Sequence, residues 1–202
     1  TSDAALVSDG TLMICDVRNV AVLGYPPAMT SGSPLRHSTP ALETLLRLDA
    51  DGNILPCLAV AWQSNHEEKT ITLNLREGVT FHDGTPFHAE AVKWNLEQQQ
   101  AANATGFSHL ASIEVAEEYT VILHLTQWDN TLLPSLCQAQ GLMISPDACQ
   151  KNGVEWASTH PVGTGPFRFQ NIASDGTISY LRYENYWQSG KPYLDEIKIV
   201  CD

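Results

Sequence analysis

An adjacent histidine and aspartate, His82 and Asp83, are the residues of this chain best suited to metal-dependent hydrolysis. That chemistry needs further histidine and carboxylate ligands on neighbouring helices. Here the pair lies in the segment 82–86, His-Asp-Gly-Thr-Pro, and Asp-Gly is a turn sequence. Three other histidines do not supply these ligands, because their spacing matches no standard metal site: His66, His88 and His124. We therefore interpret the pair as turn chemistry and predict no metal site.

The glycine and serine motifs of nucleotide-binding and hydrolytic enzymes are incomplete. Residues 163–165, Gly-Thr-Gly, lack both the Gly-Lys-Ser/Thr ending of a phosphate loop and the third glycine of a dinucleotide site. They precede Pro166 and a strand, which predicts a tight turn. The serines that lack the Gly-x-Ser-x-Gly pattern of a nucleophile are Ser33, Ser38 and Ser108. We predict a protein that is not an enzyme and needs no cofactor. A hydrolase built on the His-Asp pair is the alternative.

The chain of 202 residues is acidic, with 11 Lys and Arg against 23 Asp and Glu and a net charge of −12. Nucleic-acid binding needs a basic surface, so we expect no nucleic-acid partner. The 43% hydrophobic and 17% charged content is that of a folded, soluble protein. No apolar run reaches the roughly 18 residues that cross a bilayer, and residues 1–10 lack the pattern of a cleavable signal. Composition alone fits either a cytosolic protein or a processed exported one.

The five cysteines show no Cys-x-x-Cys pair and no metal-ligand spacing. An odd number leaves at least one thiol free, and we interpret each as a small, buried apolar side chain. A Cys137–Cys149 disulfide is an alternative, although spacing alone carries no information on geometry.

The N-terminal quarter predicts a strand, a loop and a helix. Residues 11–17 are a β-branched and apolar run typical of a buried strand. The prolines and glycines of segment 24–40 predict a long irregular loop. Thr39 and Pro40 then predict a helix start, because Thr caps free N–H groups and Pro fits the first turn. The expected buried face of that helix carries Leu42, Leu45 and Leu46.

The middle of the chain predicts two β-hairpins that flank a helix. Period-two alternation indicates a hairpin over residues 62–75 and another over 113–125. Residues 89–96 have helical spacing and lie between them. Asp51-Gly52 indicates a further tight turn.

The C-terminal part predicts short helices and a last hairpin. Asp129 or Asn130 is expected to cap one short helix. Ser145-Pro146-Asp147 is expected to open another, with the acid in its first turn, where the helix dipole favours it. Residues 161–169 turn into a strand that we expect to pair with residues 177–183. The whole pattern indicates a mixed α/β (α+β) fold, and no internal repeat is present.

Four segments together resemble the family 5 extracellular solute-binding proteins, the peptide- and nickel-binding receptors of ABC importers. They are residues 45–62 (LLRLDADGNILPCLAVAW), 73–92 (LNLREGVTFHDGTPFHAEAV), 161–169 (PVGTGPFRF) and 182–199 (RYENYWQSGKPYLDEIKI). One such segment is weak, but four in the family's order are not expected by chance. The resemblance implies the first lobe of a two-lobed, periplasmic-binding-protein-like (class II) α/β fold that closes on its ligand.

The resemblance also implies a domain division. Residues 1–45 and 160–202 are expected to form the main part of lobe I, and residues 46–159 an accessory, hairpin-rich subdomain. Members of the family are more than twice this long, so we expect a fragment of a longer receptor that lacks lobe II.

The implied function is that of a monomeric extracytoplasmic receptor, in the periplasm or as a cell-surface lipoprotein. It captures a small peptide or other small organic ligand and delivers it to an ABC permease in the membrane. In nickel-binding members a Trp and an Arg face the ligand, whereas the matching stretches here offer Phe107 and, in residues 137–143, no arginine. A nickel or metal-chelate receptor therefore stays an alternative, as does the ligand-sensing domain of a regulator. His88 replaces the family's usual Thr cap, so that helix is expected to begin one residue off.

In the family, the segment after the first strand lines the ligand cleft, and loops on rigid sheets commonly bind ligands. Its candidate contacts here are Tyr25, Met29, Leu35, Arg36 and His37. Phe107 can stack on a ligand side chain, and Gln140 is the amide candidate of residues 137–143. The alternatives are a solvated loop for the first five and core packing for Phe107. The other large aromatic residues are assigned to packing: Trp62, Trp94, Trp128, Trp156 and Tyr180.

Overall fold

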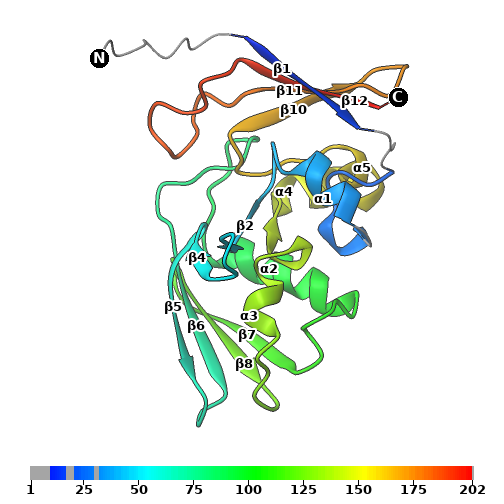
Figure 1. The fold of residues 1–202 in the computed structure, drawn as a ribbon. Helices are drawn as coiled ribbons and strands as arrows, with labels where there is room; N and C mark the ends of the chain where they lie inside the picture. The colour runs from blue at the N-terminus through cyan, green and yellow to red at the C-terminus, as the bar shows by residue number, and fades with distance from the viewer. Residues whose placement is uncertain (1–9, 17–20, 30–31, 202) are drawn as a thin grey trace.

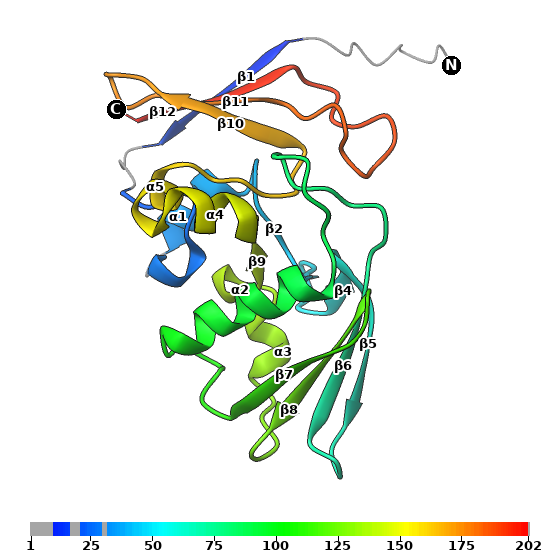
Figure 2. The same ribbon diagram turned by 180° about the vertical axis from the view of Figure 1, so that it is seen from behind.

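The computed structural model describes residues 10–16, 21–29 and 32–201. Its strands form two four-stranded sheets and two two-stranded ribbons. In Figure 1 one four-stranded sheet lies at the top and holds both the first and the last strand, and the other lies at the bottom. Helices pack between them, as the view from behind in Figure 2 also shows.

The terminal sheet has the strand order β1-β12-β11-β10. Its strands are β1 (Thr11–Asp16), β10 (Phe167–Ile172), β11 (Ile178–Arg182) and β12 (Glu196–Cys201). β1 and β12 are parallel, whereas β12, β11 and β10 are antiparallel neighbours. The predicted pairing of the last hairpin is confirmed, because β10 and β11 form it.

β1 is the strand that the sequence predicts, but the prediction that it is buried is wrong. Leu12, Met13 and Ile14 are 44%, 63% and 41% exposed. β1 lies at the edge of the terminal sheet and pairs only with β12. An apolar, β-branched run therefore marks strand propensity here without complete burial. Residue 17, the end of the predicted run, lies outside the described residues.

The hairpin sheet has the order β5-β6-β8-β7 and confirms both predicted central hairpins. Its strands are β5 (Ala59–Asn65), β6 (Thr70–Leu75), β7 (Leu110–Glu117) and β8 (Thr120–Leu125). Alternate residues of β6, Ile71, Leu73 and Leu75, are at most 3% exposed. They pack with one side of α2 (Ala89–Ala101), which Figure 2 shows alongside β7 and β8. The helix begins after His88, whose side chain makes no capping hydrogen bond.

Segment 24–40 is more regular than predicted. It contains the 3-10 helix η1 (Pro26–Ala28) and the helix α1 (Gly32–Ser38). Pro34 does not prevent α1, because it lies in the first turn, where a backbone N–H has no intrahelical acceptor.

The predicted helix after Pro40 is wrong, because α1 ends at Ser38 and the chain turns into the short strands β2 (Glu43–Thr44) and β3 (Leu46–Leu48). The three leucines of its predicted face are buried, but in different places. Leu42 packs under the terminal sheet, whereas Leu45 and Leu46 pack under the hairpin sheet. Their spacing reflects a chain that passes between two cores.

The remaining elements are short. β3 pairs with β4 (Ile54–Pro56) across the predicted Asp51-Gly52 turn. The others are α3 (Leu132–Ser135), η2 (Ala139–Gly141), β9 (Leu142–Met143), which pairs with β2, α4 (Pro146–Asn152) and α5 (Val154–Thr159). The predicted helix start at Ser145-Pro146-Asp147 is confirmed, with Asp147 in the first turn of α4. Ser145 is its N-cap, since its Oγ accepts a hydrogen bond from the Ala148 N–H at 3.1 Å.

The predicted cap of α3 is wrong by a residue or two. Thr131 occupies the N-cap position, and its side chain makes no capping hydrogen bond. The Asp129 carboxylate instead accepts hydrogen bonds from the Thr131 N–H and Oγ1. It closes a turn just before the helix.

Two hydrophobic cores result, which we call the hairpin core and the terminal core after the sheets that they contact. The aromatic residues assigned to packing lie in or against them: Trp62 and Trp128 at the hairpin core, and Trp94, Trp156 and Tyr180 at the terminal core. Cys149 of α4 and Ala157 of α5 belong to the terminal core. The predicted subdomain boundaries stay a proposal. The four cysteines at positions 15, 57, 137 and 149 are free thiols.

The junction between the two cores is polar. Glu43 of β2 accepts hydrogen bonds from Thr164 Oγ1, Tyr186 Oη and Trp187 Nε1 at 2.8, 2.8 and 2.9 Å. The Arg76 guanidinium lies 4.0 Å from the centre of the Trp187 ring. Burial raises the pKa of the Glu43 carboxyl, and its three hydrogen-bond donors act in the opposite direction. This carboxylate therefore ties segments more than a hundred residues apart.

Candidate ligand-binding site

The loop that precedes η1 is held firmly against α5. The backbone N–H groups of Leu23 and Gly24 both donate to the Ser158 carbonyl, at 2.7 and 3.1 Å. Gly24 approaches this helix so closely that a Cβ would lie 2.1 Å from the Ala157 carbonyl oxygen. Ser38 Oγ donates to the Leu23 carbonyl at 2.6 Å. The loop therefore starts from a fixed point.

The loop then passes over the C-terminal half of α2. The Tyr25 hydroxyl donates to Gln98 Oε1 at 3.3 Å. The next residues form η1, and Met29 follows with its side chain only 9% exposed. Tyr25 and Met29 are thereby placed on neighbouring parts of one surface.

The C-terminal end of α2 supplies the second wall. Asn103 adopts φ = 53°, a left-handed conformation that asparagine tolerates better than most residues. The Asn103 and Ala104 N–H groups donate back to Gln100 and Gln99. This turn exposes the short segment 103–105 beside the helix end.

The short helix η2 supplies the third wall. Gly141 ends it, and a Cβ there would lie 1.8 Å from the Leu136 carbonyl oxygen, so only glycine fits. The Leu45 N–H donates to the Gly141 carbonyl at 2.9 Å. These contacts fix the position of Gln140 at the outer side of η2. Both η1 and α2 pack against η2.

A cavity of about 300 Å³ lies where these three walls meet. Its lining residues are Pro26, Pro27, Met29, Gln99, Ala102, Asn103, Ala104, Thr105, Ala139 and Gln140. None of these described residues carries a charge. Their side-chain amides and hydroxyl can donate and accept hydrogen bonds, which suits a neutral polar ligand group such as a peptide amide.

The structure brings three of the predicted site residues together. Met29 and Gln140 line the cavity although they lie far apart in the sequence. Tyr25 lies beside it through its bond to α2. Burial raises the pKa of the Tyr25 hydroxyl, so it is a neutral donor and acceptor at ordinary pH.

The other predicted residues lie elsewhere. Phe107 is 4% exposed and packs in the hairpin core. His37 is 2% exposed, and its Nε2 lies 2.8 Å from Asp16 Oδ2. Leu35 packs partly buried against the terminal core, and Arg36 is exposed on α1. None of these four lines the cavity.

Sequence reasoning missed the polar residues of the second wall, Gln99, Asn103 and Thr105. The signal was present in the run QQQAANATG, residues 98–106, which ends a helix with amides and no charge. Two of these amides also bond within the fold, since Gln99 Nε2 donates to the Ala139 carbonyl at 3.5 Å and Gln100 Nε2 donates to the Leu110 carbonyl at 2.6 Å. The apolar periodicity predicts the helix over residues 89–96 but carries no information about residues 98–106, where it ends.

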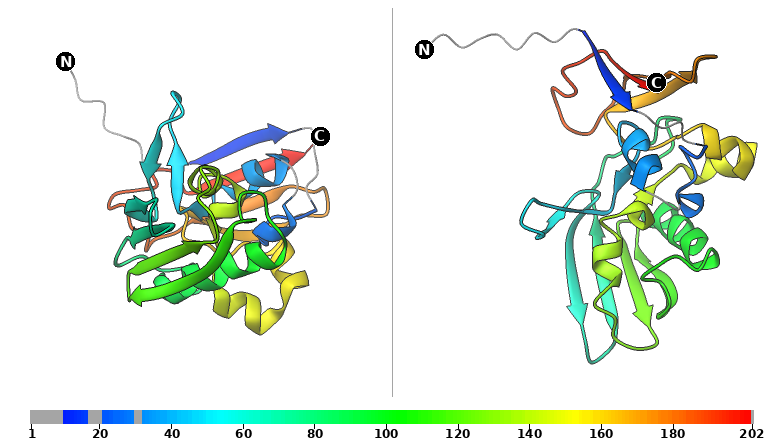
Figure 3. Two further views of the ribbon diagram at one scale, coloured as in Figure 1. Left: turned by 90° about the horizontal axis from the view of Figure 1, so that it is seen from below. Right: turned by 45° about the vertical axis from the view of Figure 1, so that its right-hand side comes forward.

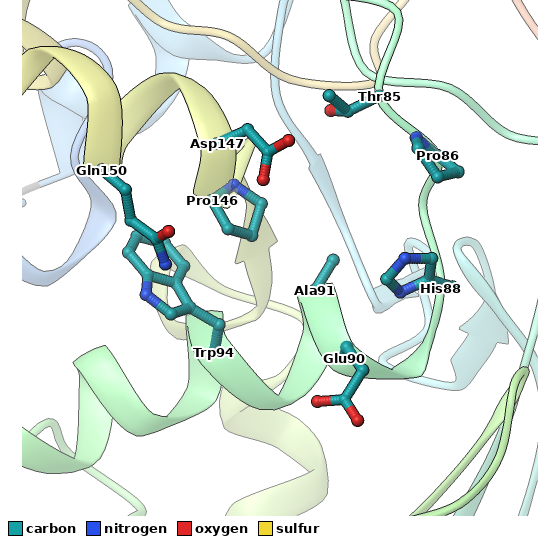
Figure 4. Close-up of a pocket in the computed structure, with 9 residues that line it drawn as sticks. All are labelled: Thr85, Pro86, His88, Glu90, Ala91, Trp94, Pro146, Asp147 and Gln150. Carbon is teal, nitrogen blue, oxygen red and sulfur yellow. The ribbon is translucent and has the colours of Figure 1, made fainter.

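A second cavity, of about 270 Å³, lies between the first turns of α2 and α4 and is drawn in Figure 4. Figure 4 shows Glu90 and Trp94 on α2, and Asp147 and Gln150 on α4. Its chemistry is acidic, in contrast to the neutral cavity at Met29. No predicted site residue lines it.

His82 and Asp83 do not form a hydrolytic pair. Asp83 accepts hydrogen bonds from Thr85 Oγ1 and Ser145 Oγ at 2.6 and 2.5 Å. His82 Nε2 donates to the Gly165 carbonyl at 2.8 Å. Burial lowers the pKa of the His82 imidazole to about 4. The two side chains thus fix a turn, as the sequence indicates.

Two features of the described part of the chain concern metal binding and membrane insertion. No three or more His, Cys, Asp or Glu side chains gather there in a way that could hold a metal ion. None of the helices in residues 10–16, 21–29 and 32–201 is long and apolar enough to span a membrane.

Known proteins resemble this chain in sequence and in fold. The glutathione-binding protein GsiB of Salmonella typhimurium is 34% identical over 160 residues, which is 76% of this chain and 31% of that protein. An ABC transporter substrate-binding protein from Sinorhizobium meliloti is 30% identical with a TM-score of 0.83, over 96% of this chain and 39% of that one. The periplasmic binding protein DppA from Helicobacter pylori, solved with the peptide STSA, is 26% identical with a TM-score of 0.84, over 96% of this chain and 43% of that one.

The chain thus spans about a third of the length of the curated relatives that it matches. The match to the family model called bacterial extracellular solute-binding proteins, family 5 Middle, covers residues 53–201, most of the chain. By sequence and by fold, this chain belongs to the family 5 bacterial extracellular solute-binding proteins.

Proposed function

We propose that this chain forms one wall of the ligand cleft of an ABC importer's receptor, and that the ligand is a small peptide or a peptide-like molecule. The observation that carries the proposal is the neutral cavity in which Met29 and Gln140 meet beside Tyr25. Two similar proteins support the ligand class: GsiB is named for glutathione, and DppA was solved with a peptide.

The chemistry of the cavity favours recognition of peptide amides. Gln99, Asn103 and Gln140 each offer an amide that can both donate and accept a hydrogen bond. A peptide backbone presents the same two groups in every residue. Recognition through backbone groups leaves the ligand's side chains free to vary, so such a site tolerates different sequences.

The ligand set that we propose is Tyr25, Met29, Gln99, Asn103 and Gln140. Tyr25 does not line the cavity but is included because its hydroxyl bonds to Gln98 of α2, next to the cavity. Leu35, Arg36, His37 and Phe107 are left out of the set because none of them lines the cavity and, among the described residues, none of their side chains hydrogen-bonds to its walls. Without a basic side chain at the cavity, a nickel chelate or another polyanion has no cationic partner among these residues. A peptide-like ligand is therefore preferred over the metal-chelate alternative.

The proposed mechanism is closure of two lobes about the ligand, after which the closed receptor docks on the permease. The receptor acts outside the cytoplasm as a monomer and binds no nucleic acid. The present chain offers one wall, so we expect it to bind peptides only in the millimolar range. Submicromolar affinity of these 202 residues by calorimetry would contradict the two-wall mechanism.

The test is a titration of the isotope-labelled chain with glutathione and with trialanine, followed by two-dimensional NMR of the side-chain amides. We expect the Gln99, Asn103 and Gln140 amide signals to shift. Gln140→Ala should weaken binding, whereas Gln150→Ala, which removes the same amide from the acidic cavity, should not. Shifts at Gln150 in place of Gln140, or no shifts at millimolar peptide, refute the proposed site.

A further inference from the structure

A buried polar pair joins the first strand to the first helix. His37 Nε2 of α1 lies 2.8 Å from Asp16 Oδ2, the last residue of β1. The side chains are 2% and 17% exposed, so the contact is largely shielded from water. In Figure 3, right, the arrowhead of β1 lies next to α1.

The pair encloses the segment that carries the proposed ligand contacts. Its two residues are 21 positions apart in the sequence. Tyr25 and Met29 both lie between them, as does the whole of η1. The contact therefore joins β1 to α1, the two described elements that flank this segment and that we call its stems.

The stem on the helix side is itself fixed to the terminal sheet. The Tyr180 hydroxyl of β11 donates to the His37 carbonyl at 2.6 Å, and this bond is buried. Ser38 Oγ donates to the Leu23 carbonyl at 2.6 Å, within the loop. His37 is thus held by β11 through its backbone and by β1 through its ring.

In the part of the chain that the structure describes, a single hydrogen bond holds the imidazole. Among the described residues, His37 Nδ1 is buried and has no hydrogen-bond partner. The Asp16 carboxylate at Nε2 therefore sets the direction of the ring. A buried polar pair of this kind adds little net stability compared with apolar packing, but its bond has a defined direction.

We propose that Asp16 and His37 are a positioning pair for ligand binding: their contact fixes the loop stems and so sets where Tyr25 and Met29 stand in the cavity. This role rests on the proposed function, since it concerns the same site. His37 then affects the ligand through the loop and does not touch it.

The experiment uses methyl-labelled methionine, because the chain holds only three methionines, Met13, Met29 and Met143. Met29 reports on the loop, and Met143, 0% exposed in the hairpin core, is the internal control. The variants are Asp16→Ala, His37→Ala and the double variant. Asp16→Asn keeps an acceptor oxygen at Nε2 and is the conservative rescue. Tyr180→Phe removes the other tie to His37 and leaves the ring pair intact.

Without ligand, each alanine variant should shift and broaden the Met29 signal and leave Met143 in place. The double variant should change Met29 no more than either single one, and Asp16→Asn should restore it. An unmoved Met29, equal changes at Met143, or additive effects of the two alanines overturn the proposal. If His37→Ala does not fold, Asp16→Ala with its asparagine rescue decides the question.

Adding glutathione or trialanine then separates this inference from the proposed function. If both leave the wild-type Met29 signal unchanged at millimolar concentration, the ligand site is wrong, while the ligand-free spectra still decide whether the pair positions the loop. If wild type responds, His37→Ala should weaken peptide binding about fivefold to tenfold. Asp16→Asn and Tyr180→Phe should stay within about twofold. Wild-type affinity in His37→Ala overturns the positioning role.

Discussion

The central strands of the hairpin sheet and the edge strand β1 of the terminal sheet bury their apolar residues to different extents. In the hairpin sheet, Ile71, Leu73, Val121 and Leu123 on the central strands β6 and β8 are all 0% exposed. In the terminal sheet, the apolar residues of the edge strand β1 are 41% to 63% exposed. The same kind of side chain thus contributes to a core on a central strand and to the surface on this edge strand.

The difference follows from where each sheet finds its partners. The hairpin sheet is built from two local hairpins and a helix between them, all within residues 59–125. The terminal sheet pairs Thr11 with Glu196, at opposite ends of the chain. Local pairing places both partners within a short loop, whereas distant pairing carries a larger chain-entropy cost and leaves β1 with a single neighbour. The edge strand β1 is therefore expected to contribute less to the free energy of unfolding than the buried central strands of the hairpin sheet.

The largest expected effect comes from two matched methionines. Met143 is 0% exposed in the hairpin core, and Met13 is 63% exposed on β1. Met143→Ala should lower the free energy of unfolding by about 3 kcal/mol, because it leaves a cavity. Met13→Ala should change it by less than about 0.5 kcal/mol. Urea unfolding of both variants measures the contrast, and equal losses would refute it.

The second prediction concerns the loss of stability in acid that follows from the buried imidazole of His82. Burial holds the folded-state pKa of His82 at about 4, below its ordinary 6.5. Below pH 6.5 the unfolded chain therefore takes up a proton that the folded chain does not. The contribution of His82 to the free energy of unfolding is therefore fully present above pH 6.5. It is lost as the pH falls from 6.5 to 4, by about 3 kcal/mol in total.

His82→Asn should remove this part of the pH dependence. Relative to its own stability at pH 7, the variant should lose less than wild type between pH 6.5 and 4. The control for a lost imidazole is His66→Asn, at an exposed position of the β5–β6 turn. Urea unfolding at several pH values measures both variants. A His82→Asn curve parallel to that of wild type would contradict the prediction.

The third prediction tests the hydrogen bonds of Glu43 at the junction of the hairpin core and the terminal core. Glu43→Ala leaves three donors, on Thr164, Tyr186 and Trp187, without their acceptor. We expect a loss of about 2 kcal/mol in the free energy of unfolding. Glu90→Ala, at an exposed carboxylate of α2, should change it by less than about 0.5 kcal/mol. Equal effects at the two glutamates would show that the junction does not depend on this carboxylate.

How well the sequence predicts a feature also depends on whether that feature is local in the chain. The alternation of Ile71, Leu73 and Leu75 is a local signal, and both the hairpin and its buried face follow from it. The spacing of Leu42, Leu45 and Leu46 is equally regular but misleads, because these residues enter two different cores. Periodicity reports burial and does not report which core buries the residue.

The candidate site was predicted only in part for a related reason. Met29 and Gln140 came from the family resemblance, and only the fold brings them to one cavity. Asn103 joins them through a left-handed turn that propensity alone does not place. His37 looked like a contact because its type and loop suited one, whereas its burial against Asp16 depends on where β1 ends.

The smallest expected effect comes from removing a single methylene group on each of the two strands, β1 and β6. Ile14 of β1 is opposite Ile199 of β12 in the register, and Ile199 is 1% exposed, so one side of Ile14 can rest against a buried neighbour. Ile71→Val at a fully buried position should cost about 1 kcal/mol. Ile14→Val, at 41% exposure, should cost about half as much, because solvent already occupies much of its surroundings. Matched urea titrations resolve such a difference only when both variants unfold with the same slope. An equal loss of unfolding free energy at Ile14 and Ile71 would contradict this expectation. It would mean that β1 contributes to the terminal core as fully as β6 contributes to the hairpin core, and that exposed area does not explain the difference between the two strands.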